Sequence, residues 1–210
     1  MENLTNITTG EVRLSFVHLF KPYAFQPGQD EKFSCTILVP KTDMDTMNRI
    51  NTAIEAAKQR GVSEKWNGIA PPMIPTPVYD GDGVRSSDGM PFGPECRGHW
   101  VFTASAKMDY PPEIVDKQGN PIINQSEVYS GMYARVNVTF FPYAFGGKKG
   151  VGCGLGPVMK MRDGESLGGS APTAAQAFGT QPPAQQSNPY AQPPSVQAQP
   201  RINPITGMPM

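Results

Sequence analysis

Residues 127–149 read EVYSGMYARVNVTFFPYAFGGKK, and this stretch predicts a long β-strand with two chemically different sides. Successive side chains of a strand point to opposite sides of its sheet. One side would be apolar, with Val128, Met132, Ala134, Val136, Val138 and Phe140. The other side would carry Tyr129, Tyr133, Arg135, Asn137, Thr139, Phe141 and Tyr143, with Lys148 and Lys149 just beyond. The first side predicts a core, and the second is typical of a surface on which flat, negatively charged polymers stack.

Four other segments predict strands, the first three by the same alternation and the last as a glycine-rich strand. They are residues 12–20, 32–39, 99–108 and 150–161. In the first of them Val12, Leu14, Phe16, His18 and Phe20 alternate with Arg13, Ser15, Val17 and Leu19, so that some apolar residues fall on both sides. Five short strands with long connections favour a mainly β fold, a small and partly open barrel, over alternating βα units.

One substantial helix is predicted after the second strand. Thr42 would be its N-cap, and Gly61 lies just past its end. Its apolar residues form a single stripe that would pack on the sheet, namely Met44, Met47, Ile50, Ile54 and Ala57. Its cations Arg49, Lys58 and Arg60 would face solvent. The chain from residue 69 to 95 is rich in Pro, Gly and Asp, and an irregular connection of this length is typically functional or mobile.

The composition divides the chain into a domain, residues 1–163, and a tail, residues 164–210. The tail has nine Pro and seven Gln but only two aromatic residues, too little apolar surface to offset the entropy of ordering, so it is predicted to be disordered. The domain is long enough to bury a core without disulfides, and three widely spaced cysteines indicate a reducing compartment. No apolar run of membrane-spanning length and no signal-peptide pattern occur, so a cytoplasmic location is expected.

Catalytic and metal-binding motifs are weak in this sequence. The glycine-rich residues 150–156 do not form a dinucleotide-binding fingerprint, because Pro157 and a strand-like segment follow where a helix must begin. A divalent metal in a nuclease-like site could be held by Asp80, Asp82, Asp88 and Glu95. Asp-Gly pairs more commonly form turns. Cys96 and His99 have the spacing of half a zinc site, without a second half. We therefore expect that the protein is not an enzyme.

The polar side of residues 127–149 is the strongest candidate site. Its rings could stack on bases, at about 1–3 kcal/mol each and with tolerance of sequence, while nearby cations neutralise phosphates. The predicted nucleic-acid-binding residues are Tyr129, Tyr133, Arg135, Phe141, Tyr143, Lys148, Lys149, Lys107, Arg13 and Lys32. The formal net charge of the chain is zero, so any basic surface must be local. Two alternatives stay open: the rings could be covered in the core, or the same surface could bind protein in a structural or scaffold role.

Several stretches also resemble, in order and at similar spacing, a phage-encoded family of single-stranded DNA-binding proteins. This family was first catalogued as a domain of unknown function and is built on an OB-fold. The stretches span about residues 10–169 and read RLSFVHLFKP, FSCTILVPKTD, VYDGDG, RGHWVFTASAK, EVYSGMYARVNVTFFPYAF, GKKGVGCGLGPVMKMRDGE and LGG. The resemblance implies a five-stranded OB-fold barrel with one substantial helix.

The resemblance also implies a function. Such a protein would coat and protect single-stranded DNA during phage replication or recombination, in the host cytoplasm, without catalysis and without a metal or other cofactor. Its partners would be single-stranded DNA and phage or host replication and recombination proteins, with no membrane; the oligomeric state is not implied. The last residues, RINPITGMPM, contain no acidic side chain, so recruitment of partners through an acidic C-terminal tip is not expected here.

Overall fold

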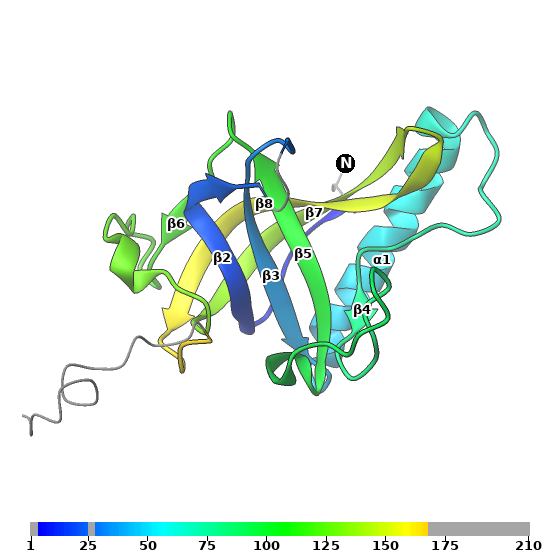
Figure 1. Cartoon of the computed structure of the whole chain (residues 1–210). Coiled ribbons are helices and arrows are strands. Elements are labelled where there is room, and N and C mark those ends of the chain that lie inside the picture. Colours follow the sequence, from blue (N-terminus) through cyan, green and yellow to red (C-terminus); the bar gives the residue numbers. More distant parts are fainter. Residues whose placement is uncertain (1–3, 25–27, 168–210) are drawn as a thin grey trace, which may run out of the picture. The chain divides into compact units, whose positions relative to one another are not determined.

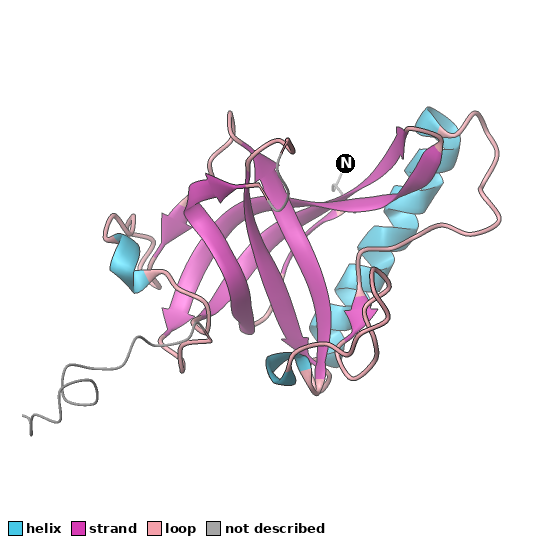
Figure 2. Cartoon of the chain, in the orientation of Figure 1, coloured by secondary structure: helices cyan, strands magenta, loops and turns pink. Residues whose placement is uncertain are grey.

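The computed structural model describes residues 4–24 and 28–167, which form a mainly β domain with a long helix (Figures 1 and 2). The strands are β1 (Asn6–Thr8), β2 (Val12–Tyr23), β3 (Lys32–Pro40), β4 (Tyr79–Asp80), β5 (His99–Lys107), β6 (Ile114–Val115), β7 (Tyr133–Phe145) and β8 (Lys148–Arg162). The helical elements are α1 (Met44–Arg60), the π-helical turn η1 (Gly61–Lys65) and the 3-10 turns η2 (Pro94–Cys96) and η3 (Gln125–Glu127). Long connections separate these elements.

Five of the strands form a closed ring of hydrogen-bonded pairs. β7 pairs with β2, β2 with β3, β3 with β5, β5 with β8, and β8 with β7. The β5–β8 pair is parallel and the other four pairs are antiparallel. In Figure 1, β2, β3 and β5 lie side by side, and β7 and β8 pass behind them. The predicted fold, mainly β with five principal strands and one substantial helix, is confirmed.

The interior of the ring is apolar, as the alternation predicts. The β7 residues Ala134, Val136, Val138 and Phe140 are fully buried. Across the core, the ring of Phe102 on β5 lies 6.1 Å from that of Phe140 between centroids. The helix α1 adds Ile50, Ala53, Ile54 and Ala57 to the same cluster, so it packs by one face. The apolar side of the stretch from Met132 to Phe140 is therefore the core side.

A β-bulge in β2 turns Phe16 away from the core. The register between β2 and β3 shifts between Ser15 and His18, and Phe16 has a positive φ of 47°. A bulge inserts an extra residue into one strand, which interrupts the strict alternation of sides. Phe16 is consequently 58% exposed, although Val12 and Leu14 before it are buried. The alternation places Phe16 on one side of the strand with Val12 and Leu14, and the bulge breaks this grouping.

The helix α1 begins one residue later than predicted. Asp43, not Thr42, is the N-cap, and its carboxylate accepts a hydrogen bond from a backbone N–H of the first turn at 3.0 Å. Met44, which belongs to the predicted apolar stripe, is exposed because it directly follows this cap. Arg49, predicted to face solvent, donates a hydrogen bond to the carbonyl group of Thr8 at 2.7 Å. This hydrogen bond connects the helix to the end of β1.

The last turn of α1 is tied to the β7–β8 hairpin by Trp66. The helix continues through η1 beyond Gly61, and Trp66 follows with only 1% of its surface exposed. Its indole N–H donates a hydrogen bond to the carbonyl group of Tyr143 at 3.0 Å. The ring packs so closely on Gly61 that a Cβ there would lie 2.5 Å from it. Figure 1 shows the hairpin reaching the end of the helix.

The long predicted strand is shorter than residues 127–149 at its start. β7 begins at Tyr133, and residues 128–132 form a turn after η3. Gly131 in this turn has a φ of 115°, a backbone conformation that glycine adopts without strain. The alternation argument therefore does not apply to Tyr129, because this residue lies outside the strand.

The predicted tail falls mostly beyond the residues that the structure describes. Residues 164–167 are described and contact the domain, for example through the backbone N–H of Leu167, which donates to the carbonyl group of Ser130 at 2.8 Å. The rest of the predicted disordered tail, from residue 168 onward, lies outside the described residues. Within residues 4–24 and 28–167, no helix is long and apolar enough to cross a membrane.

Candidate nucleic-acid interface

The outer side of β2, β3 and β5 carries a groove that residues 77–96 flank. Its main hollow has a volume of about 540 Å³. The strands line it with Phe16, Thr36, Val101 and Thr103, and residues 77–96 line it with Tyr79, Arg85, Phe92 and Glu95. A second hollow of about 500 Å³ shares Thr103 and is lined also by Tyr23, Lys32, Ser34 and Ser105. We call these two adjoining hollows the outer groove.

Three aromatic rings outside the core line the main hollow, and the buried ring of Phe102 also borders it. Phe16 is turned outward by the bulge. A positive φ costs a residue other than glycine about 1–3 kcal/mol. Such strain is concentrated at functional sites, where the surrounding structure maintains it. The rings of Tyr79 and Phe92 form a tilted pair with centroids 6.3 Å apart. Phe16 and Tyr79 are exposed, so planar groups can stack on them.

The other end of the outer groove is basic and polar. Lys32 and Lys107 lie directly opposite each other in the β3–β5 register, and both are exposed. Like charges in this position repel each other, so an anion between them would stabilise the pair. The hydroxyl oxygen of Ser34 is buried and has no hydrogen-bond partner among the described residues. The structure thus brings together two of the predicted cations beside an unsatisfied hydroxyl group.

His18 and Tyr23 extend the aromatic lining beside the second hollow. Their rings stack with centroids 4.6 Å apart and an interplanar angle of 10°. Burial lowers the pKa of His18 below its ordinary value, so the imidazole is neutral at neutral pH. In the β2–β3 register His18 is opposite Ser34, which places it on the outer side of the ring, not in the core.

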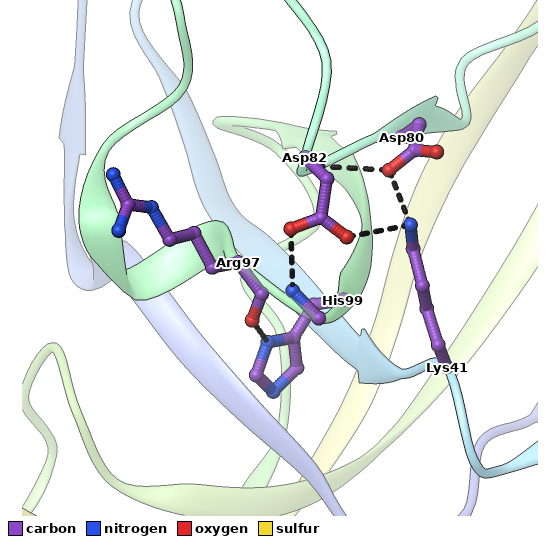
Figure 3. Close-up of polar contacts among 6 residues, drawn as sticks. Lys41, Asp80, Asp82, Arg97 and His99 are labelled. Carbon is purple, nitrogen blue, oxygen red and sulfur yellow. Dashed lines mark hydrogen bonds and ion pairs between the residues drawn. The ribbon is translucent and has the colours of Figure 1, made fainter.

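Residues 77–96 are joined to the sheet by three charged residues, Lys41, Asp80 and Asp82, which we call the Lys41 cluster (Figure 3). The Nζ atom of Lys41 lies 2.6 Å from Asp80 Oδ1 and 2.7 Å from Asp82 Oδ2. The other carboxylate oxygen of Asp82 accepts a hydrogen bond from the backbone N–H of Gly98 at 3.0 Å. The hydrogen bonds from Lys41 lower the pKa of both carboxyl groups and raise the pKa of the ammonium group.

A divalent-metal nuclease would need a metal site, and the part of the chain that the structure describes contains none. Within that part, no group of three His, Cys, Asp or Glu side chains could hold a metal ion. Asp80 and Asp82 are both paired with Lys41. Asp88 is paired with Arg85 at 2.9 Å, and its carboxylate also accepts a hydrogen bond from a backbone N–H of the same turn. These aspartates therefore order turns, as Asp-Gly sequences commonly do.

The strand β1 pairs with an edge of β7 and forms hydrogen bonds with the polar side chain of Asn137. It pairs with β7 along residues 137–139, and the side-chain amide of Asn137 donates a hydrogen bond to Asn6 at 2.9 Å. Arg135 is exposed, and its Nε donates to the carbonyl group of Thr9 at 3.3 Å. The hydrogen-bonding edge of this segment of β7 is therefore occupied by β1. A role of Arg135 in DNA binding stays a prediction.

Three more of the predicted residues hold the chain after β8 on the sheet. The ring centroid of Tyr133 lies 3.4 Å from the guanidinium carbon of Arg162 and 5.9 Å from that of Arg13. Arg13 donates a hydrogen bond to the carbonyl group of Glu165 at 2.8 Å. The Tyr129 hydroxyl donates a hydrogen bond to the carbonyl group of Gly164 at 2.9 Å. These interactions give Arg13, Tyr129 and Tyr133 a structural role. Their part in DNA binding remains a prediction.

The remaining predicted residues meet on the β7–β8 hairpin. A Cβ atom added to Gly152 of β8 would lie 2.8 Å from the ring of Phe141, and one added to Gly150 would lie 2.6 Å from the hydroxyl of Tyr143. Each ring therefore covers a glycine backbone, which explains Gly150 and Gly152 of β8. Lys148 is exposed, and the Nζ of Lys149 lies 3.5 Å from the carbonyl oxygen of Trp66. The hairpin thus presents rings and cations together.

Sequence reasoning missed the aromatic lining of the main hollow. Phe16 gave no signal, because a bulge leaves no mark on an alternating pattern. Tyr79, Arg85 and Phe92 lie in the irregular stretch of residues 69–95, whose length was the one indication of function. Their meeting with Phe16 depends on how this stretch folds back on the strands.

Comparison with known proteins gives consistent matches. Residues 5–188 match the family described as the ssDNA-binding protein of Enterobacter phage Enc34. A curated protein of Acyrthosiphon pisum secondary endosymbiont phage 1, designated p50, is 27% identical over 176 residues, which cover 82% of this chain and 91% of p50. The fold is similar to that of the bacteriophage Enc34 single-stranded DNA-binding protein in complex with ssDNA, with a TM-score of 0.65 and 27% identity over 78% of this chain and 90% of the other.

A more distant structure shares the fold. It is gp2.5, a single-stranded DNA-binding protein encoded by bacteriophage T7, with a TM-score of 0.51 and 15% identity over 87% of this chain and 98% of the other. The match of the Enc34 family extends over most of the sequence and agrees with the five-stranded ring. This chain belongs to the phage single-stranded DNA-binding protein family represented by that of Enterobacter phage Enc34.

Proposed function

We propose that this protein binds single-stranded DNA in the outer groove, with bases stacked in the main hollow and phosphates beside Lys32 and Lys107. Phe16 is the observation that carries the proposal, because its exposed ring is held toward the groove by a strained backbone. In OB-folds, the face of the second and third strands is a common binding surface for oligonucleotides. The similarity to the Enc34 protein in complex with ssDNA supports the same ligand.

The chemistry of the outer groove suits a single strand better than a duplex. Bases of a single strand can turn their flat faces toward protein rings, whereas those of a duplex are already stacked on their neighbours. Stacking is tolerant of sequence because every base has such a face. The formal net charge of zero limits the electrostatic contribution to local cations such as Lys32 and Lys107. We therefore infer that stacking contributes much of the affinity.

Fluorescence anisotropy tests this proposal directly. Labelled oligo-dT and a duplex of equal length are titrated with the protein at several salt concentrations. We expect saturable binding to oligo-dT that weakens as salt rises, and much weaker binding to the duplex. Equal binding to both, or binding to neither, would contradict the proposal.

Replacement of both Lys32 and Lys107 by alanine should weaken binding to all sequences and make it less sensitive to salt. For a single strand, each phosphate that the protein no longer neutralises reduces the slope of log K against log salt by about 0.7. Folding stability should not fall, because the change removes a pair of like charges. Lys117→Ala, at an exposed lysine in the 116–120 turn, is the matched control and should leave the slope unchanged. An unchanged slope in the double variant would remove these lysines from the interface.

We further propose that the β7–β8 hairpin makes a second contact with the bound strand, through Phe141, Tyr143, Lys148 and Lys149. The exposure of Phe141 and Lys148 on one hairpin supports this assignment. Arg135 also stays a candidate because it is exposed on the same strand. A nucleic acid that spans both surfaces would need a longer site than the outer groove alone, so affinity should keep rising with oligonucleotide length.

In the cell, we infer a role in coating and protecting single-stranded DNA during phage replication or recombination. Membership of the phage family supports this role and implies the cytoplasm of an infected host as its location. We infer a binding role without a chemical step, since Asp80, Asp82 and Asp88 are all paired with cations. Replication and recombination proteins of phage or host are the proposed further partners.

A further inference from the structure

Residues 77–96 supply the aromatic side of the outer groove, yet they have little regular structure. β4 pairs with β5 through only two residues. Beyond β4, an isolated bridge joins Val84 to Pro91 within the segment itself. The same segment must place Tyr79 and Phe92 opposite the strands that carry Phe16. Interactions other than strand pairing must therefore hold it against the ring.

The Lys41 cluster provides such interactions, because it joins three separate pieces of chain (Figure 3). Lys41 directly follows β3, Asp80 and Asp82 belong to the turn at the end of β4, and Gly98 directly precedes β5. Asp82 bridges the ammonium group of Lys41 and the backbone N–H of Gly98. The backbone N–H of Lys41 in turn donates to the carbonyl group of Gly98 at 2.9 Å.

The turn at the cluster is packed tightly against the chain before β5. The backbone N–H of Gly81 donates to the carbonyl group of His99 at 2.9 Å. Gly81 is buried, and the carbonyl group of Cys96 leaves no room for a Cβ at this position. In this position the turn brings the carboxylates of Asp80 and Asp82, on either side of Gly81, close to each other, so their negative charges must be balanced. Lys41 balances them in part by placing one positive charge between the two carboxylates.

Lys41 itself is poorly suited to contact a phosphate. Its ammonium group already meets two carboxylates, and it lies 5.0 Å from the ring centroid of Trp100. The cluster keeps one excess negative charge, which repels a polyanion. Lys41 lines a different hollow, between α1 and residues 76–78, and not the outer groove. Lys41 acts on the outer groove only indirectly, through its ion pairs with Asp80 and Asp82 of residues 77–96.

On the basis of the proposed function, we propose that Lys41 is a positioning residue for single-stranded DNA binding: it holds residues 77–96 against the β3–β5 edge and so keeps the aromatic side of the outer groove in place. A groove that is ordered in advance does not lose conformational entropy when the ligand binds. Without Lys41 the carboxylates of Asp80 and Asp82 repel each other in one short turn. The segment then loosens, and ordering it opposes binding.

Lys41→Met keeps the length of the side chain and removes its charge, so it is the primary test. We expect affinity for oligo-dT to fall by about three- to tenfold, the cost of ordering one or two side chains. Hydrogen exchange of residues 79–97 should be faster in the DNA-free variant than in the wild type. The slope of log K against log salt should stay unchanged, because Lys41 neutralises no phosphate. Lys41→Arg should restore affinity and protection, since it keeps the charge.

Two further variants separate positioning from simple charge effects. Lys58→Met removes a lysine that pairs with Glu55 on α1 at 2.7 Å, outside the outer groove, and should bind like the wild type. Asp82→Ala removes a negative charge, which by electrostatics alone would tighten binding to DNA. Positioning predicts the opposite, weaker binding with faster exchange, because the variant lacks the bridge from Lys41 to Gly98. This variant also serves if Lys41→Met fails to fold.

The outcomes distinguish this inference from the proposed function. If the wild type binds oligo-dT but Lys41→Met binds equally well, the inference is wrong and the proposed function stands. A salt slope reduced by about 0.7 in Lys41→Met would make Lys41 a phosphate-binding residue and would also overturn the inference. Tighter binding by Asp82→Ala would do the same. If the wild type itself does not bind single-stranded DNA, both the proposed function and the inference fail.

Discussion

Phe16→Ala is expected to weaken binding of single-stranded DNA by about 1–3 kcal/mol, the value of one base stacked on an aromatic ring. This corresponds to an increase of about 5- to 150-fold in Kd. The ring is 58% exposed in the main hollow, so its removal takes away a stacking surface and little packing. Titration of oligonucleotides of different sequence should show a similar loss for each. Thermal unfolding should change little.

Phe16→Gly separates binding from strain at this position. Glycine adopts positive φ without cost, whereas a left-handed conformation costs other residues about 1–2 kcal/mol. We expect this variant to bind as weakly as Phe16→Ala and to unfold at an equal or higher denaturant concentration. Tyr110→Ala is the aromatic control, because Tyr110 is 72% exposed and lines neither hollow. If Phe16→Ala kept full affinity while Phe141→Ala lost it, the interface would lie on β7 and not in the outer groove.

Trp66→Ala is expected to lower the free energy of unfolding by about 3–5 kcal/mol, the range for a buried aromatic side chain cut back to alanine. The indole is nearly fully buried, fills the space that Gly61 leaves, and donates a hydrogen bond to Tyr143. Its removal would leave a cavity between the end of α1 and the hairpin, together with an unpaired carbonyl group. Denaturant unfolding followed by circular dichroism measures the change. A decrease below about 1 kcal/mol would show that the site collapses without cost.

Trp66→Phe tests whether the hairpin contributes to DNA binding. This change keeps most of the packing and removes the hydrogen bond to Tyr143, so we expect a decrease of about 1–3 kcal/mol in stability. If Tyr143 and its neighbours contact DNA, binding of long oligonucleotides should weaken while binding of short ones stays unchanged. Equal affinity at both lengths would leave the outer groove as the sole interface.

The positions of the main strands were predictable because their alternation has a period of two. Residues 32–39 and 99–108 correspond to β3 and β5 within a few residues, and the strand predicted at the glycine-rich residues 150–161 corresponds to β8. The apolar side of β7 is the core side, as expected from Ala134 to Phe140. Burial of one side selects for this pattern, so the sequence carries it directly.

The orientation of several side chains was not predictable in this way. The bulge at Phe16 changes the side on which a ring appears without changing the composition of the strand. The hydrogen bonds between Asn137 and β1 depend on pairing between residues about 130 positions apart. Tyr129 lies in a turn that contains Gly131 with a positive φ. None of these features leaves a local pattern.

The candidate site was predictable in its chemistry more than in its location. Aromatic rings with cations on a β-surface are expected from the sequence, and the outer groove contains both. Lys32 and Lys107 are predicted from separate strands, and the β3–β5 register places them opposite each other. The other predicted residues lie on β7, on the hairpin or beside the chain after β8. The rings of the main hollow come from β2 and from residues 77–96, which meet only in the folded chain.

The amino-acid sequence alone was sufficient to indicate a mainly β domain, a helix after its second strand, and the family to which the chain belongs. Periodic burial and ordered motifs are local properties, and they can be recognised without knowledge of tertiary contacts. The tertiary structure decided which rings reach solvent, which lysines face each other, and what holds residues 77–96 in place. The strand register and the Lys41 cluster join residues that are distant in sequence. The bulge at Phe16 changes the side on which a ring lies without leaving a periodic signal.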